Sequence, residues 1–407
     1  MTDAQYRWVI VGYTLVIQAV AIGMLIYSFA LFALPWLDVF NAPRAEVMLT
    51  ISISQVVAGL VSPVVGRAMD LYPIKRFVLS GLGLLVLGLL VASRAQALWQ
   101  IQLVYATLFP VSLTLMSTLP AQTLITRWFF DKRGVAIGLS ATGTNLGGIV
   151  FPLLVAAWLT AIGWRETMVW LALVALLLVG PLTWWVLRRE PAARPTVAGG
   201  YRAPRLWTSG EILRSGMFWI PSLGLVVLNL GFGAVQFNLG AFGRDVGFSA
   251  SDAANLIALN AICMIFGKFF FGAIGDKADH RVMYWLAATF MALAMIMLQG
   301  QPSAAAFVAG VVMVGLSGGG ILPMFGVVYG QRFGVASFAR VMGFAMLVMT
   351  VGAFGPLLAG WAHDLTGSYD FAFQTFLALI LPAAVLMFWL PKPAPAADVI
   401  ETADAAG

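Results

Sequence analysis

Two short stretches decide the fold of this chain: Gly66-Arg67-Ala68-Met69-Asp70 and Gly272-Ala273-Ile274-Gly275-Asp276. Each stretch ends a long apolar run with the pattern Gly-x-x-x-Asp, and the two copies lie 206 residues apart. Basic residues follow each aspartate within six positions. A duplicated turn between long hydrophobic runs indicates that the protein consists of two similar halves in a membrane.

The composition supports a chain that crosses a membrane many times. Hydrophobic residues make up 61% of the 407 residues and charged residues only 10%, unlike a soluble domain. This length has room for about twelve helices of ~20 residues. We predict an all-α membrane protein with two six-helix halves, residues 1–187 and 216–390, joined by a cytoplasmic linker at 188–215 and followed by a disordered cytoplasmic tail at 391–407. The predicted spans are 8–33, 47–66, 74–93, 98–126, 134–160, 168–187, 216–242, 250–273, 282–299, 303–330, 338–362 and 371–390.

The distribution of positive charge predicts the orientation. With the amino terminus and the even-numbered connections on one side, that side carries 18 of the 23 Lys and Arg residues. The opposite side carries Arg44, Arg94, Arg165 and Arg244, and Lys268 lies inside a span. Because positive charge stays cytoplasmic, both termini are expected inside the cell. The net charge of +6 follows from these loops and does not indicate binding to nucleic acid.

Enzymatic activity is not expected. One cysteine, Cys263, allows no intrachain disulfide and no cysteine-based metal site. Gly315-Leu316-Ser317-Gly318-Gly319 fits the Gly-x-Ser-x-Gly pattern of serine hydrolases. A serine nucleophile needs a histidine within reach, and His280 and His363 are expected near the two membrane surfaces. We therefore predict no catalytic residues, no cofactor and no metal site, and we interpret the glycines of 134–160 and 303–330 mainly as helix-packing positions.

The two Gly-x-x-x-Asp turns resemble the loop motif of the major facilitator superfamily, which follows the second and eighth spans there. The stretch from Arg127 to Gly138 resembles the fourth-to-fifth span junction of monocarboxylate transporters and oxalate/formate antiporters, and Tyr27-Ser28-Phe29 and 43–47 fit bacterial members of that group. The resemblance implies a monomeric multi-pass carrier in a bacterial inner membrane. Vertebrate members have a lysine and an aspartate at the positions that correspond to Ala30 and Met264 of this chain, which weakens any transfer of their proton-coupling scheme.

Lys268 is the candidate that carries the chemistry. It is the one Lys or Arg well inside a predicted span, eight residues before Asp276, or roughly 12 Å along a helix. A lysine at the bilayer centre costs about 2.5–3.5 kcal/mol, and no predicted span offers a deep Asp or Glu partner. A bound anion would supply the missing counter-charge, and the resemblance places a substrate-binding basic residue here. The alternative is that Lys268 extends along the helix to Asp276 or Asp279 at the cytoplasmic face.

Further polar residues lie in spans that line the cavity in this superfamily. We predict that Asn260, Tyr27, Asn145, Gln236 and Asn238 contact the substrate. The alternative for each is a hydrogen bond to a neighbouring helix, since polar side chains also join helices in lipid.

Charged residues at the cytoplasmic ends of the spans are interpreted as a gate. We predict that Asp70, Asp276, Arg76, Arg133 and Arg340 close the inside of the carrier when its cavity faces out. Either aspartate could also cap the amino terminus of a neighbouring helix, where negative charge is favoured. The alternative to a gate is that these charges only set the orientation of the chain in the membrane.

The sequence thus predicts a secondary active transporter for a small organic monoanion, such as a monocarboxylate, that works by alternating access between the two halves. Uptake with a proton is the commonest mode in the family, and exchange or facilitated diffusion remains open. The alternative is a multidrug or metabolite efflux antiporter. Such exporters usually carry a Gly-Pro pair in the fifth span, whereas here Gly355-Pro356 lies in the eleventh.

Overall fold

The computed structural model describes residues 2–129, 132–189 and 206–392, and within these ranges every regular element is a helix. The amino-terminal half contains α1 (Asp3–Ile22), η1 (Gly23–Tyr27), α2 (Phe29–Phe40), α3 (Arg44–Leu71), α4 (Ile74–Ser93), α5 (Leu98–Ala106), α6 (Leu108–Met116), α7 (Thr118–Trp128) and α8 (Arg133–Val186). The carboxy-terminal half contains α9 (Ser209–Leu213), α10 (Gly216–Asp245), α11 (Ala250–Gly275), α12 (His280–Met297), α13 (Ala304–Phe333), η2 (Val335–Ser337), α14 (Phe338–Met349), η3 (Thr350–Ala353), α15 (Phe354–Thr366), α16 (Asp370–Leu386) and η4 (Met387–Trp389).

Eleven helical segments of the described chain are long and apolar enough to cross a membrane. One of them, α8, has 54 residues, which at 1.5 Å per residue is about 80 Å, far more than the ~30 Å of a hydrocarbon core. Gly163 interrupts it with φ 76° and ψ 170°, a backbone conformation that a residue without a Cβ adopts readily. The segment therefore makes two crossings, and the predicted twelve spans are present.

Three of the crossings, the first, the fourth and the eleventh, are broken, which the predicted spans did not show. The eleventh consists of α14 and α15 with the short 3-10 helix η3 between them. The first contains a π-helix, η1, and Ser28 after it donates its hydroxyl to the carbonyl of Gly23 at 2.8 Å. The fourth consists of α5, α6 and α7, interrupted at Thr107 and Ser117. Each interruption lies three residues before a proline, Pro110 or Pro120, because proline lacks the N–H that would continue the helical ladder.

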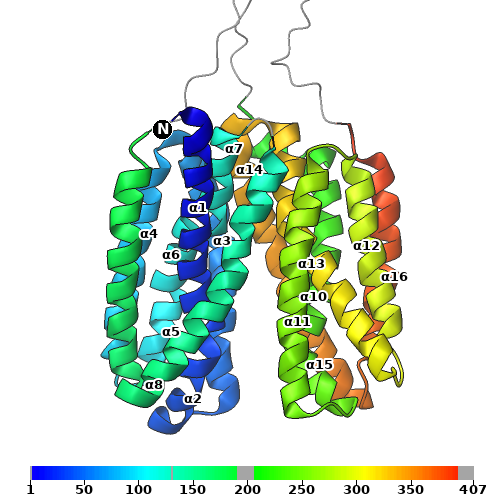
Figure 1. Ribbon diagram of the computed structural model, residues 1–407, viewed down its shortest axis with the longest axis horizontal. Helices are drawn as coiled ribbons and strands as arrows, with labels where there is room; N and C mark the ends of the chain where they lie inside the picture. The colour runs from blue at the N-terminus through cyan, green and yellow to red at the C-terminus, as the bar shows by residue number, and fades with distance from the viewer. Residues whose placement is uncertain (1, 130–131, 190–205, 393–407) are drawn as a thin grey trace, which may run out of the picture.

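Two hydrophobic cores correspond to the two halves. One is built almost entirely from residues of 6–186, and the other from residues of 212–390 with a few side chains of α3, α6 and α7. Figure 1 shows the halves as two bundles that approach each other at the end carrying the amino terminus and diverge toward the opposite end. The two bundles meet along α3, α7, α8, α11, α13 and α14.

The predicted linker and tail fall partly outside the described residues, at 190–205 and 393–407. The described part of the linker is not featureless. The short helix α9 begins at the N-cap Thr208, whose hydroxyl accepts from the backbone N–H of Glu211 at 3.3 Å, and the chain around it contacts the second half.

Candidate functional site

Helices α8 and α11 touch along a seam of glycines between the two halves, which we call the α8–α11 seam and define by Gly134, Gly138, Lys268, Gly272 and Asp276. A Cβ added to Gly138 would lie 2.5 Å from the backbone oxygen of Lys268, and one added to Gly272 would lie 2.5 Å from the oxygen of Gly134. Both distances are shorter than real Cβ contacts allow. The glycines therefore permit backbone-to-backbone contact between the halves, as small residues do in membrane proteins.

Lys268 sends its ammonium across this seam into the other half. The Nζ donates to the carbonyl of Ala141 at 2.7 Å, to the hydroxyl of Thr144 at 2.6 Å and to the side-chain oxygen of Asn145. The residue is 1% exposed. The three N–H groups of the ammonium thus have three oxygen partners on α8, and the alternative in which Lys268 reaches Asp276 or Asp279 is not what the structure shows.

Neutral oxygens account for the burial of this charge without cancelling it. A hydrogen bond to a charged group contributes about 1.5–3 kcal/mol, so three of them are enough to offset a burial cost of about 2.5–3.5 kcal/mol. None of these oxygens carries a counter-charge. An anion about 4 Å away would still gain roughly 4 kcal/mol at an effective dielectric of about 20.

A second seam joins α3 to α14, defined by Ser62, Gly66, Asp70, Arg340 and Gly343. Asp70 pairs with Arg340, with an oxygen–nitrogen distance of 3.4 Å and side-chain exposures of 1% and 12%. A Cβ on Gly343 would overlap the carbonyl oxygen of Ser62, so the backbones touch here as well. This ion pair connects the end of the first Gly-x-x-x-Asp motif to the other half.

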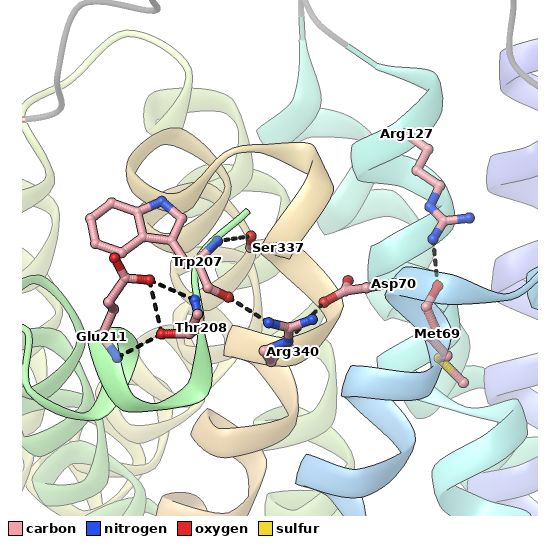
Figure 2. A network of polar contacts seen from close by, with 8 residues as sticks. All are labelled: Met69, Asp70, Arg127, Trp207, Thr208, Glu211, Ser337 and Arg340. Carbon is pink, nitrogen blue, oxygen red and sulfur yellow. Dashed lines mark hydrogen bonds and ion pairs between the residues drawn. The ribbon is translucent and has the colours of Figure 1, made fainter. Parts of the chain in front are cut away.

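Arg340 also holds the described part of the linker, as Figure 2 shows. Its Nη1 donates to the carbonyl of Trp207 at 2.6 Å, while the N–H of Trp207 donates to the hydroxyl of Ser337 at 2.9 Å. The Trp207 ring packs edge-on against Phe333 with ring centroids 5.2 Å apart. One guanidinium therefore connects the amino-terminal half, the linker end and α14.

The remaining predicted gate residues differ in their contacts. Asp276 accepts from the backbone N–H groups of Gly134 at 2.7 Å and Val135 at 3.4 Å, so it caps the start of α8 across the seam. Arg133 donates its Nε to the carbonyl of Phe129 at 3.1 Å. Arg76 is exposed in the first turn of α4, and no ion pair to it is seen within the described ranges. The geometry thus brings both motif aspartates, but not Arg76, to contacts between the halves.

The two seams are copies of each other. Ser62, Gly66 and Asp70 correspond to Lys268, Gly272 and Asp276 with an offset of 206, and Gly134 and Gly138 correspond to Ala339 and Gly343 with an offset of 205. In one seam the backbone oxygen of Lys268 lies against Gly138, and in the other the backbone oxygen of Ser62 lies against Gly343. In both seams the aspartate lies at the first turn of the partner helix. The duplication predicted from the motifs therefore extends to individual contacts, with Lys268 on one copy only.

The other predicted substrate residues divide into two groups. Tyr27 ends the π-helix, is 38% exposed, and its ring lies against Gly148. Gln236 is half-buried, and its side-chain oxygen has no hydrogen-bond partner within the described part of the chain. By contrast, Asn238 donates to the carbonyls of Ala234 at 2.9 Å and Pro356 at 3.4 Å. Asn238 therefore bonds a neighbouring helix, the alternative use for a polar residue in a span.

Asn145 and Asn260 are both buried. Asn145 contacts Lys268 in space, and Asn260 lies eight residues before Lys268 on α11. Asn145 accepts from Lys268 and donates to the carbonyl of Ala261 at 3.4 Å, so its amide is occupied within the α8–α11 seam. Asn260 is fully buried, and neither atom of its amide has a hydrogen-bond partner among the described residues. Its oxygen lies toward Gly315 of α13.

Sequence reasoning named Asn145 as a substrate contact and predicted none of the three partners of Lys268. The carbonyl of Ala141 and the hydroxyl of Thr144 belong to a span interpreted as glycine packing. The adjacent polar pair Thr144-Asn145 inside an apolar helix was a usable signal, because buried polar groups require partners. The Ser317 of the hydrolase-like pattern donates to the carbonyl of Ala287 at 2.8 Å and is fully buried, which is a packing contact between α13 and α12.

Comparisons with known proteins agree with this architecture. The model of the Major Facilitator Superfamily matches residues 16–249 and 222–406. Monocarboxylate transporter 13 of Bos taurus is 28% identical over 396 residues, covering 96% of this chain and 90% of that protein. The MFS-type transporter YcxA of Bacillus subtilis is 22% identical over 381 residues, covering 90% of this chain and 91% of its own length.

Solved structures share the fold at low sequence identity. The human organic anion transporter MFSD10 (TETRAN) superposes with a TM-score of 0.71 at 14% identity, covering 95% of this chain and all of that one. The Escherichia coli fucose:proton symporter gives a TM-score of 0.68 at 12% identity, covering 96% and 99%. With a family model that spans nearly the whole sequence, a duplicated motif and a duplicated seam, this chain belongs to the Major Facilitator Superfamily and is a multi-pass membrane transporter rather than an enzyme.

Proposed function

We propose that the protein moves a small organic monoanion, such as a monocarboxylate, across the inner membrane by alternating access, with Lys268 as the ligand of the substrate carboxylate. The observation that carries the proposal is the buried ammonium on the α8–α11 seam, held by neutral oxygens and facing no carboxylate among the described residues. A single point charge without a second basic residue beside it suits one carboxylate rather than two.

The contacts between the halves support a carrier closed on the side of its termini. The two halves contact each other through Asp70–Arg340 and Asp276–Gly134 at the ends of the motifs. Deeper in the molecule they contact each other through Gly59–Thr350 and Asn145–Ala261. We infer that these contacts form the cytoplasmic gate and that the two seams separate when the carrier faces the cell interior. Tyr27, Gln236 and Asn260 remain candidates for orienting the substrate.

The relatives favour the same substrate class. Proteins named monocarboxylate transporters align over almost the whole chain, from Bos taurus, Rattus norvegicus and Mus musculus. Uptake together with a proton or by exchange with a second anion both fit a lysine-centred site. A pH gradient imposed on proteoliposomes distinguishes them, because exchange needs an internal anion and no gradient.

The test is a Lys268→Gln variant in proteoliposomes, with Lys277→Gln as a matched control because Lys277 is an exposed loop residue. Removing the charge is expected to lower uptake of small monocarboxylates at least ten-fold, since a ligand contact of about 1.5–3 kcal/mol is lost. The control should transport normally. Full uptake by Lys268→Gln with unchanged affinity would remove the proposal.

A thermal-shift screen on the purified protein tests the substrate class independently. A ligand that binds the native state raises the melting temperature. We expect shifts with small monocarboxylates that disappear in Lys268→Gln. Shifts with lipophilic cations and with no anion would favour the efflux antiporter instead.

A further inference from the structure

The three bonds of Lys268 have a mechanical consequence that is separate from anion binding. Their acceptors lie on α8 and their donor on α11, so each bond joins the two halves. The other hydrogen bonds seen between these helices within the described ranges come from Asn145, to Ala261 and Met264. Nearer the termini the seam consists of glycine backbones and the cap by Asp276.

The same N–H groups cannot serve α8 and a substrate at once. An ammonium has three donors and no acceptor, and all three are directed at α8 in this conformation. The bonds of the ammonium to neutral oxygens are already charge-assisted, and a carboxylate adds the attraction of an opposite charge. An arriving carboxylate therefore competes with the oxygens that hold the seam closed.

We propose that Thr144 and Asn145, together with the carbonyl of Ala141, are positioning residues that form a latch with Lys268, and that substrate opens the cytoplasmic side by taking the ammonium from them. The proposal rests on the proposed function for the substrate, but the latch itself stands on the geometry of the seam. The latch keeps the cytoplasmic side closed until a substrate binds.

The single native cysteine makes a clean reporter possible. Cys263→Ser removes the one thiol, and Ser62→Cys places a near-isosteric thiol at the corresponding position of the other seam. Ser62 is 5% exposed, and its hydroxyl bonds the carbonyl of Ala58 in its own helix. A membrane-impermeant maleimide applied to the side of the termini should label this thiol when the halves separate. Because Ser62 lies on α3, labelling reports global opening rather than local disturbance of α8.

The decisive comparison is Thr144→Val against Thr142→Val in this background. Both substitutions remove a hydroxyl from α8, but among the described residues Thr142 bonds only the carbonyl of Leu139 in its own helix. Loss of one hydrogen bond to the ammonium is expected to raise the labelling rate about ten-fold for Thr144→Val. Thr142→Val should label at the parent rate.

Asn145→Asp is expected to slow the labelling of Ser62→Cys, a result that a folding defect would not produce. The substitution turns the amide oxygen that faces Lys268 into a carboxylate, so the latch becomes an ion pair. Labelling should fall below the parent rate, and a mixture of formate, acetate, lactate and pyruvate should no longer accelerate it.

Equal labelling of Thr144→Val and Thr142→Val, or faster labelling of Asn145→Asp, would overturn the latch. Opposite shifts of these variants, with no response of the parent protein to the four carboxylates, would keep the latch and contradict the proposed substrate. Acceleration of the parent by these carboxylates, lost in Asn145→Asp, supports both.

Discussion

The Lys268 ammonium brings a positive charge into the contact between two helices, where three neutral oxygens of α8 surround it. The sequence indicates the lysine, because a basic residue within an apolar span is expensive and therefore functional by default. It does not indicate the partners, which lie more than 120 residues away in the chain and include a backbone carbonyl. Residue-level reasoning identifies unusual charges more easily than the neutral atoms that stabilise them.

The Asp70–Arg340 pair leads to a prediction at the same scale. Asp70→Asn keeps the shape of the side chain but leaves the Arg340 guanidinium, 12% exposed, without its counter-ion. We expect the closed conformation to lose about 2 kcal/mol, since removing one partner leaves an uncompensated charge. The measurement is the melting temperature together with maleimide labelling of Ser62→Cys in Cys263→Ser protein.

The control for this variant is Asp38→Asn, because Asp38 is exposed on α2 and forms no ion pair within the described ranges. The control should melt and label like the parent. An unchanged labelling rate for Asp70→Asn would contradict a gating role for the pair.

At the scale of helices, the number of crossings and the close packing of glycines were predicted, and the breaks within the crossings were not. The number of crossings follows from apolar length, and the glycines of 134–160 pack closely as predicted, with Gly143 and Gly147 against the backbone of α1 and Gly138 against α11. The breaks in the first, fourth and eleventh crossings were not predicted. They depend on where a proline or a π-turn falls within a helix that is otherwise uniformly apolar, and hydropathy does not register either.

A prediction at the scale of elements concerns Gly138. Alanine at this position would place a Cβ 2.5 Å from the carbonyl oxygen of Lys268, so α8 and α11 would have to move apart. We expect Gly138→Ala to favour the conformation open to the termini, with faster labelling of Ser62→Cys and slower transport.

Gly83→Ala is the matched control, because a Cβ at Gly83 of α4 would meet nothing within 4 Å. This substitution should leave labelling unchanged and could add up to about 1 kcal/mol of helix stability. Equal behaviour of the two alanine variants would mean that close backbone contact at the seam is not required for closure.

The whole molecule is two helical bundles whose contacts repeat with the offset of the sequence motif. This was predictable, because the duplicated Gly-x-x-x-Asp turn sets the topology and the lengths of the apolar runs set the number of crossings. The orientation in the membrane rests on the positive residues and stays a prediction. In our proposal the identity of the substrate depends on the neutral polar groups around Lys268, whose arrangement the sequence does not specify.

The predicted orientation has a direct test with reporter fusions. A fluorescent protein fused to the carboxy terminus should be fluorescent, and alkaline phosphatase fused there should be inactive, because that enzyme folds only outside the cytoplasm. Alkaline phosphatase inserted between α12 and α13, next to Gly300, should be active. The reverse pattern would overturn the assignment of both termini to the cytoplasm.

Ser62 and Lys268 occupy matching places in a doubled framework, and only one of them is charged. In our proposal the matched glycines and aspartates of both copies close the carrier, whereas Lys268, present on one copy, both helps to hold it closed and binds the substrate. Ser62 is therefore a position where a charged residue could be introduced to change the selectivity, because it is already buried against the opposite half.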